Sequence, residues 1–201
     1  MLSSEESKAV AASVARIESR TGVQVVVAII RKADTYIELP WKAFALGVSI
    51  AALVTVLADV RWPQWVTSDT ALIHAAVILA TGAACALLAV FVPPFARRFL
   101  RETHAHVEVR QHAKALFLER ELFRTPRRDA VLILVSEFER RVEILPDVRL
   151  HGMITEGEWQ RVIDAMTPPL RGSRRALAVQ EGLNVVEPLL VSKGFQRGHD
   201  A

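Results

Sequence analysis

Two long runs without charged side chains constrain this chain more than any other feature. Residues 43–58 carry no ionisable group, and in residues 71–92 the ionisable groups are His74 and Cys85. At a rise of 1.5 Å per residue, the second run spans roughly 33 Å, which matches a hydrocarbon core of about 30 Å, whereas the first spans roughly 24 Å. Both runs predict membrane-spanning helices, and the alternative is a helical hairpin buried in a soluble domain.

The predicted hairpin occupies residues 41–95, with spans at about 43–60 and 71–93. Bulky aromatic residues, which favour the headgroup region, stand at its ends and in its connection: Trp41, Trp62, Trp65, Phe95 and Phe99. Pro93 and Pro94 should end the second helix, because proline cannot donate a backbone hydrogen bond. The hairpin therefore has both the length and the boundaries of a membrane anchor.

Cations around the hairpin predict its orientation. Three cations precede the first span and three follow the second, whereas the connection 59–70 contains Arg61. The flanking cations are Arg31, Lys32, Lys42, Arg97, Arg98 and Arg101. By the positive-inside rule, both termini are cytoplasmic in a multi-pass protein of the cell (inner) membrane. These flanks account for much of the formal net charge of +3. Nucleic-acid binding is not expected, since no aromatic residues are interleaved with the arginines.

The sequence on either side of the hairpin alternates between helices and strands. A capping box at Ser3–Glu6 predicts a helix that stops at Gly22, and the β-branched run 23–30 predicts a strand buried on both faces. After the hairpin, a helix is expected over 102–123 and a second buried strand over 130–135.

The end of the chain predicts one more strand and two more helices. Residues 140–145 alternate between polar and apolar, as in an edge strand. A second capping box, Thr155 with Glu158, opens a helix that Pro168 and Pro169 should end, and a last helix is expected over about 174–191. The fold class is α/β: a small α/β/α sandwich, interrupted after its first strand by the hairpin. Its discontinuous domain comprises residues 1–38 and 97–201.

Three stretches of the soluble part resemble a known family. They are residues 17–27, then 115–117 with Thr125, Arg127, 129–133 and 139–144, and finally Trp159 with the helix containing 178–186. On these segments the chain resembles the TPM domain family, whose members include thylakoid-lumen proteins of photosystem II repair and membrane-anchored bacterial proteins. The family commonly has Asn-Gly where this chain has Asp129-Ala130. The resemblance implies an α/β/α fold, and in some members weak acid-phosphatase activity or calcium binding by acidic loop residues.

Four carboxylates are the candidate metal ligands. Asp34 follows the first predicted strand, Glu137 and Glu139 follow the second, and Glu156 opens a later helix that could reach the same edge. Ligands in α/β folds collect beyond the carboxyl ends of parallel strands, and carboxylate oxygens suit calcium or magnesium. The alternative is that all four are solvated loop residues.

Other charged groups give weaker signals. His104 and His106 are two apart, so on a helix they do not share a face, and solvated histidines are expected there. Arginines cluster at 127–128, 140–141 and 171–175, where they could meet anionic lipid or an acidic partner.

No complete catalytic constellation is visible in the sequence. We therefore expect a membrane-anchored cytoplasmic TPM-like domain that acts as a binding or scaffolding module for a membrane complex. Its expected partners are the lipid bilayer and a membrane protein or a second copy of the chain. The alternative is a divalent-metal-dependent, acid-phosphatase-like hydrolase.

Overall fold

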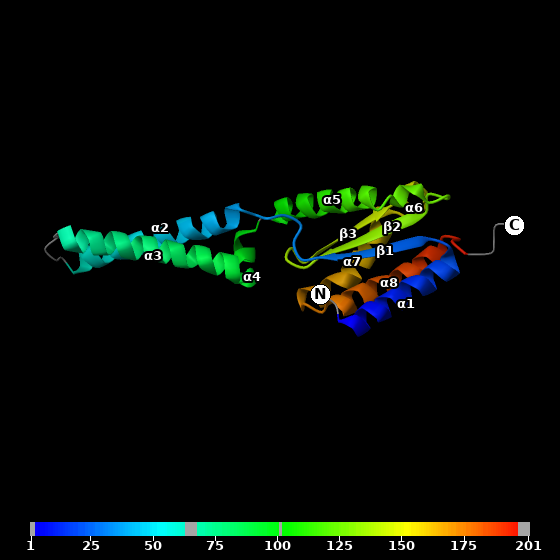
Figure 1. Ribbon diagram of the computed structural model, residues 1–201, viewed down its shortest axis with the longest axis horizontal. Coiled ribbons are helices and arrows are strands. Elements are labelled where there is room, and N and C mark those ends of the chain that lie inside the picture. Colours follow the sequence, from blue (N-terminus) through cyan, green and yellow to red (C-terminus); the bar gives the residue numbers. More distant parts are fainter. Residues whose placement is uncertain (1–2, 63–67, 101, 197–201) are drawn as a thin grey trace. The chain divides into compact units, whose positions relative to one another are not determined.

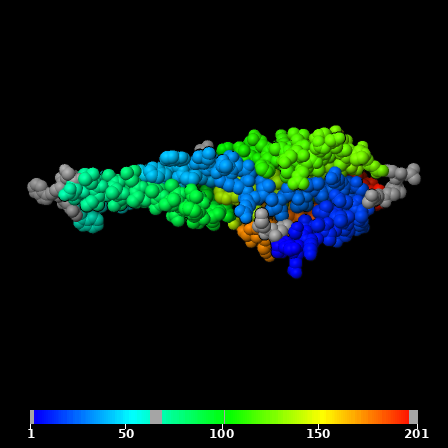
Figure 2. Space-filling model, viewed as in Figure 1, coloured from blue at the N-terminus to red at the C-terminus, as the bar shows by residue number. Residues whose placement is uncertain are grey.

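The computed structural model describes residues 3–62, 68–100 and 102–196 (Figures 1 and 2). The chain divides into two compact units, one formed by Met1–Asp34 with Thr103–Ala201 and the other by Thr35–Glu102. The first unit is mostly helical around a small mixed sheet, which makes it an α/β unit. Two of the predicted membrane-flanking residues, Trp65 and Arg101, lie outside the described residues.

The sheet has three strands in the order β1 (Gln24–Ile30), β2 (Ala130–Ser136) and β3 (Arg141–Pro146). β1 runs parallel to β2, and β3 runs antiparallel to it. Every residue of β2 is buried, as expected for a central strand. The prediction that β1 is buried on both faces is wrong, because β1 lies at an edge and most of its residues are half-buried. β3 forms the other edge, as its alternation predicted.

Helices cover both faces of this sheet (Figure 1). α1 (Ser4–Thr21), α7 (Glu156–Arg171) and α8 (Arg175–Ser192) pack against the face that carries Val131, Ile133 and Val135. α5 (Glu102–Glu119) and the short 3₁₀ helix η2 (Leu122–Arg124) pack against Leu132 and Leu134 on the opposite face. Successive side chains of a strand point to opposite faces, so the continuous apolar run of β2 supplies both cores.

Both capping boxes are present. The Ser3 backbone N–H donates to Glu6 at 2.7 Å, and Thr155 does the same to Glu158 at 2.9 Å. These bonds satisfy amide groups that have no partner within the helix. Gly22 ends α1 with φ = 74°, a left-handed conformation that glycine adopts without steric cost. The capping boxes at Ser3 and Thr155 and the stop at Gly22 are therefore confirmed.

The prediction that Pro168 and Pro169 end a helix is wrong. α7 continues through both to Arg171, with Pro169 and Leu170 buried. Proline has a helix-compatible φ, and burial of these side chains offsets the backbone hydrogen bonds that the two rings remove. The short helix α6 (Val148–Met153) was not expected from the sequence; Asp147 caps it by accepting from the Val148 N–H at 2.7 Å.

The second unit is a pair of long helices, α2 (Glu38–Arg61) and α3 (Ser68–Phe91), followed by α4 (Pro93–Ala96) and the 3₁₀ helix η1 (Arg97–Phe99). Each long helix has 24 residues, which corresponds to roughly 36 Å. α3 ends before Pro93, as expected, and Pro93 begins α4. By length and composition, both helices could cross a membrane.

Small residues bring α2 and α3 close together. A Cβ added at Gly82 would lie 2.5 Å from Cγ2 of Val48, and one at Gly47 would lie 2.8 Å from Sγ of Cys85. Large apolar side chains point outward instead, among them Val54, 59% exposed, and Leu79, 58% exposed. Small residues at the contact and large ones outside are typical of membrane helix pairs.

Candidate functional site

The carboxyl end of the sheet is built from the turn after β2 and the segment after β1. The backbone N–H groups of Glu137 and Phe138 donate to the carbonyls of Ile30 and Arg31, each at 3.0 Å. The ammonium of Lys32 lies 5.1 Å from the centroid of the Phe138 ring. The two loops therefore continue the β1–β2 pairing beyond the strands, where the sequence placed its candidate ligands.

Glu139 holds these loops together. Its side chain is buried, at 8% exposure, and its carboxylate accepts from the hydroxyl of Ser136 and from the Ala33 N–H at 3.0 Å. Because Ser136 is fully buried, its hydroxyl needs this acceptor. Glu139 thus has a structural role that the sequence did not suggest.

The other predicted ligands are placed differently. Glu137 pairs with Nε of Arg175 at 3.1 Å, and Asp34 follows β1 at the limit of the first unit. Glu156 lies at the opposite end of the sheet, because β3 carries the chain back to Ala130 before α7 begins. Its neighbour Glu158 pairs there with Lys193, just beyond the end of α8. The expectation that Glu156 reaches the carboxyl edge is therefore wrong.

No group of three or more potential ligands gathers into a metal site within the described part of the chain. The calcium or magnesium site at Asp34, Glu137, Glu139 and Glu156 remains a prediction for its first three residues. Glu137 and Glu139 would have to exchange their present partners for a cation. Of the histidines, His104 pairs with Glu108 at 3.4 Å and His74 with Asp59 at 3.6 Å.

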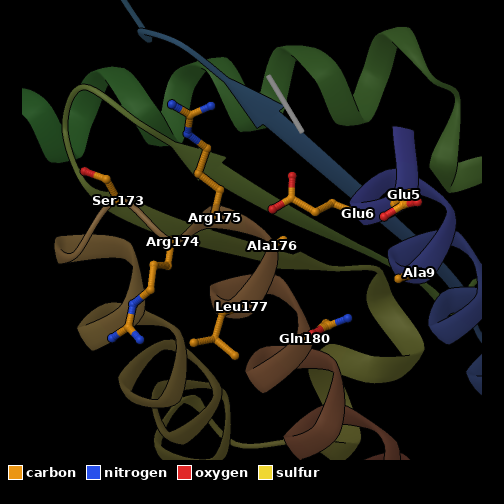
Figure 3. Close-up of a pocket in the computed structure, with 9 residues that line it drawn as sticks. All are labelled: Glu5, Glu6, Ala9, Ser173, Arg174, Arg175, Ala176, Leu177 and Gln180. Carbon is orange, nitrogen blue, oxygen red and sulfur yellow. The ribbon is translucent and has the colours of Figure 1, made fainter. Parts of the chain in front are cut away.

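An open depression of about 720 Å³ lies between the first turns of α1 and α8 (Figure 3). Both charge signs line it, with Glu5 and Glu6 on one side and Arg174 and Arg175 on the other. The backbone and hydroxyl of Ser3 hydrogen-bond the Glu6 carboxylate and lower its pKa. Such a lining suits a polar or zwitterionic ligand. Sequence reasoning missed it because nothing local places α1 beside the arginines at the start of α8.

A second depression, of about 490 Å³, lies at the amino end of the sheet and is lined by Glu18, Arg127 and Asp129, among others. Beside it, Arg128 makes a bidentate contact with Asp147, with Nε 2.9 Å from Oδ2 and Nη2 3.0 Å from Oδ1. This hydrogen bonding raises the pKa of Arg128. The arginine clusters are therefore divided: Arg127 and Arg128 lie at one end of the sheet, and 140–141 and 171–175 lie at the other.

Comparisons with known proteins relate this chain to solved structures and to a family model. A search of the curated proteins finds no match. A solved structure, the BA42 protein of the psychrophilic bacterium Bizionia argentinensis, aligns with a TM-score of 0.58 at 11% identity, covering 100% of this chain and 89% of that one. The N-terminal domain of a protein from P. gingivalis aligns with a TM-score of 0.49 at 15% identity, covering 98% of this chain and 82% of that one.

The first of these likenesses shows a shared fold. The family comparison is more specific: residues 92–188 match the family model described as the TPM domain. The matched region contains the β2–β3 hairpin and the helices α5 and α7. It includes Arg127 and Asp129, two of the residues on which the resemblance rests. The chain therefore contains a TPM domain at residues 92–188.

Proposed function

We propose that this protein is a TPM domain anchored in the cell membrane by the α2–α3 pair, with both termini in the cytoplasm, and that the domain serves as a binding module for a membrane protein. The observation that carries the proposal is the outward placement of large apolar side chains along both helices. In water this surface would cost about 25 cal/mol per Å² of exposed apolar area, whereas hydrocarbon removes that cost.

The positions of charged residues support the orientation. Arg31, Lys32 and Lys42 precede or open α2, and Arg97 and Arg98 follow α3, while Arg61 lies at the far end of α2. The positive-inside rule then keeps the TPM domain in the cytoplasm. The Asp59–His74 pair joins the two helices near their connection, where charged groups can reach the headgroup region.

A binding role agrees with the geometry of the acidic residues. Glu137 is paired with Arg175, and Glu139 accepts two hydrogen bonds that fix the loops. Both carboxylates therefore have structural partners, and no contact among the described residues specifically favours the hydrolase alternative. Fold alone does not confer catalysis, so function depends on the surfaces that the domain presents.

Cysteine labelling in intact cells tests the anchor and its orientation. In a Cys85→Ala background, Asp69→Cys at the start of α3 should react with an impermeant maleimide from outside. The matched variant Ser19→Cys, exposed on α1, should react only after the membrane is opened. The reverse pattern would overturn the orientation, and extraction of the chain by alkaline carbonate would overturn insertion.

Purification in mild detergent tests the binding role. We expect a stoichiometric membrane-protein partner to co-purify with the full chain. Hydrolysis of p-nitrophenyl phosphate by the purified protein, dependent on added calcium or magnesium and lost in Glu137→Gln, would instead favour the hydrolase alternative.

A further inference from the structure

The outer edge of β3 presents backbone groups for pairing. The Asp147 N–H donates to the carbonyl of Ala130 at 2.8 Å, in register with the β2–β3 ladder. In an antiparallel ladder, hydrogen-bonded and non-hydrogen-bonded pairs alternate. Arg141, Glu143 and Leu145 therefore direct their backbone groups toward β2, and Val142 and Ile144 direct theirs outward. Neither of these two residues makes a backbone hydrogen bond to another described segment.

The other edge of the sheet is partly closed. Along β1, successive backbone N–H groups point alternately toward β2 and away from it. The Gln24 N–H donates toward β2, to the Asp129 carbonyl, so the Val25 N–H points outward. A carboxylate oxygen of Glu18 accepts from the Val25 N–H at 3.0 Å. Blocking an edge in this way limits pairing with other chains. β3 carries no comparable block among the described residues.

A row of basic residues on α5 runs beside the β3 edge. Ala105, Val109 and Ala113 are buried at four-residue spacing, and Val109 and Ala113 pack in the same core as Leu132 of the sheet. Each of these buried residues is followed directly by an exposed basic residue. The three are His106, Arg110 and Lys114. Nε of Arg110 lies 3.6 Å from Glu143 on β3, so this row faces the β3 side of α5. We call these three residues the α5 row.

Positive charge along this edge exceeds negative charge. Burial raises the pKa of Glu143, while the charges of His106, Arg110, Arg141 and Lys114 each act to lower it. One carboxylate therefore stands among four basic side chains. The side chain of Arg110 remains 55% exposed, which leaves it accessible to an additional acidic group.

The spacing of the α5 row matches that of an extended chain. Residues four apart on a helix are separated by about 6 Å along the axis. Alternate residues of a β-strand are separated by roughly 6.6 Å and point to the same face. A strand paired to β3 would thus bring every second side chain past successive members of the row.

We propose that the β3 edge binds an extended acidic segment of a partner polypeptide as a fourth strand, with alternate Asp or Glu side chains directed toward the α5 row and Arg141. Backbone pairing to Val142 and Ile144 supplies the alignment, and the cations select the sequence. The inference rests on the proposed binding role and specifies the chemistry of the partner. A second copy of β3 fits less well, because it carries one Arg and one Glu, Arg141 and Glu143, and so brings no net negative charge to the basic residues.

Fluorescence anisotropy with defined peptides tests this proposal on the full detergent-purified chain. The probe is a labelled octapeptide that alternates Glu and Val. We expect saturable binding to the probe and none to a Lys–Val peptide of the same length. A Glu–Val peptide methylated on its alternate, β3-facing backbone nitrogens should bind at least tenfold more weakly. Equal binding of the methylated peptide would overturn strand pairing.

The double variant Arg110→Glu with Lys114→Glu should raise the Kd for the probe at least tenfold, or about 1.4 kcal/mol. Lys8→Glu with Arg171→Glu reverses the same number of charges elsewhere on the domain and should leave the Kd within about twofold. Similar losses in both double variants would overturn the assigned site. Circular dichroism of each variant controls for folding.

Hydrogen exchange locates the contact. The probe should slow hydrogen exchange at the amides of Val142 and Ile144. Protection confined to other segments would overturn the proposal. Protection of these two amides in a dimer formed without peptide would also overturn it. Cysteine labelling reports separately on the anchor. Probe binding without membrane insertion refutes only the anchor, and insertion without probe binding refutes only the edge site.

Discussion

The helix pairs α2–α3 and α7–α8 differ in where their large apolar side chains lie. In α7–α8, large apolar side chains such as Met166, Leu183 and Leu190 are fully buried. In α2–α3, Gly47 and Gly82 lie where the two helices approach closely, and many of the large apolar side chains point away from the partner helix. Both pairs bring a glycine close to the neighbouring helix, so close approach alone does not distinguish them.

The difference shows which solvent each pair is built for. Water favours burial of large apolar groups, whereas in hydrocarbon these groups gain nothing from burial, and small residues allow the backbones to approach. The placement of large side chains therefore predicts where substitutions are harmful in each pair.

The largest expected effect is on the inward-facing core of α7–α8. Leu183→Ala should lower the free energy of unfolding by about 2–5 kcal/mol, because it removes buried methyl groups and leaves a cavity. Thermal unfolding in detergent, followed by circular dichroism, measures the loss. The outward-facing Leu79→Ala should change the stability of the TPM domain by less than about 0.5 kcal/mol. Equal losses would contradict the comparison.

A charge on the outside of α3 should be nearly as costly, but only in a membrane. Leu79→Arg places a guanidinium near the middle of the helix, where insertion scales give roughly 2.5–3.5 kcal/mol. The fraction of chain recovered in carbonate-washed membranes should fall, while circular dichroism of the full chain purified in detergent stays unchanged. Unaltered recovery would indicate that this face does not contact lipid.

The two close-approach glycines should respond differently to alanine. The methyl group of Gly82→Ala meets the stiff Val48 at 2.5 Å and the Phe44 ring at 2.9 Å, so overpacking should cost about 1–3 kcal/mol. In Gly182→Ala it meets Sδ and Cγ of the buried Met166 at 2.5 and 2.7 Å, but methionine adapts more readily than valine, and alanine favours helix by about 1 kcal/mol, so the loss should be smaller. Melting temperatures of both variants in detergent, with Gly152→Ala as an open-space control, test the order.

The smallest effect concerns the ion pair that joins the start of α7 to the end of α8. Hydrogen bonds from the Thr155 backbone and the Lys193 side chain lower the pKa of Glu158 to about 2. A depressed carboxyl pKa stabilises the fold above the unfolded value near 4.5, and this stabilisation disappears as pH falls toward 2.

Glu158→Gln should therefore melt below the parent protein at pH 6, with the difference shrinking steadily toward pH 2. Glu156→Gln removes a charge from the same turn and serves as the control. A difference that stays constant down to pH 2 would show that the Glu158 carboxylate is not the cause.

Local sequence signals predicted much of the fold. Ser3 with Glu6, Thr155 with Glu158, and Gly22 mark helix ends because their interactions lie within a few residues. The prolines at 168 and 169 led to a wrong prediction of the end of α7. Burial of Pro169 in the tertiary core outweighs the loss of the backbone hydrogen bonds that the two rings remove. β1 was expected to be buried on both faces, because its apolar run does not reveal that it pairs on one side only, with β2.

The candidate site was only partly predictable for the same reason. Glu137 and Glu139 do follow β2, but their partners, Arg175 and Ala33, are distant in sequence. Glu156 was assigned to the wrong end of the sheet because the path of the chain through α6 was not foreseen. The sequence shows the three basic residues of the α5 row, but it does not show that they lie beside β3, because tertiary packing decides that position.

The sequence by itself determined the two apolar helices, the helix caps and the alternation of helices and strands, because hydrophobic length, capping and periodicity act over short distances along the chain. Tertiary structure alone decided that β1 is an edge, that Glu139 joins two loops, and that the α5 row accompanies the open edge of β3. These features depend on contacts between segments far apart in sequence, and long-range packing fixes such contacts.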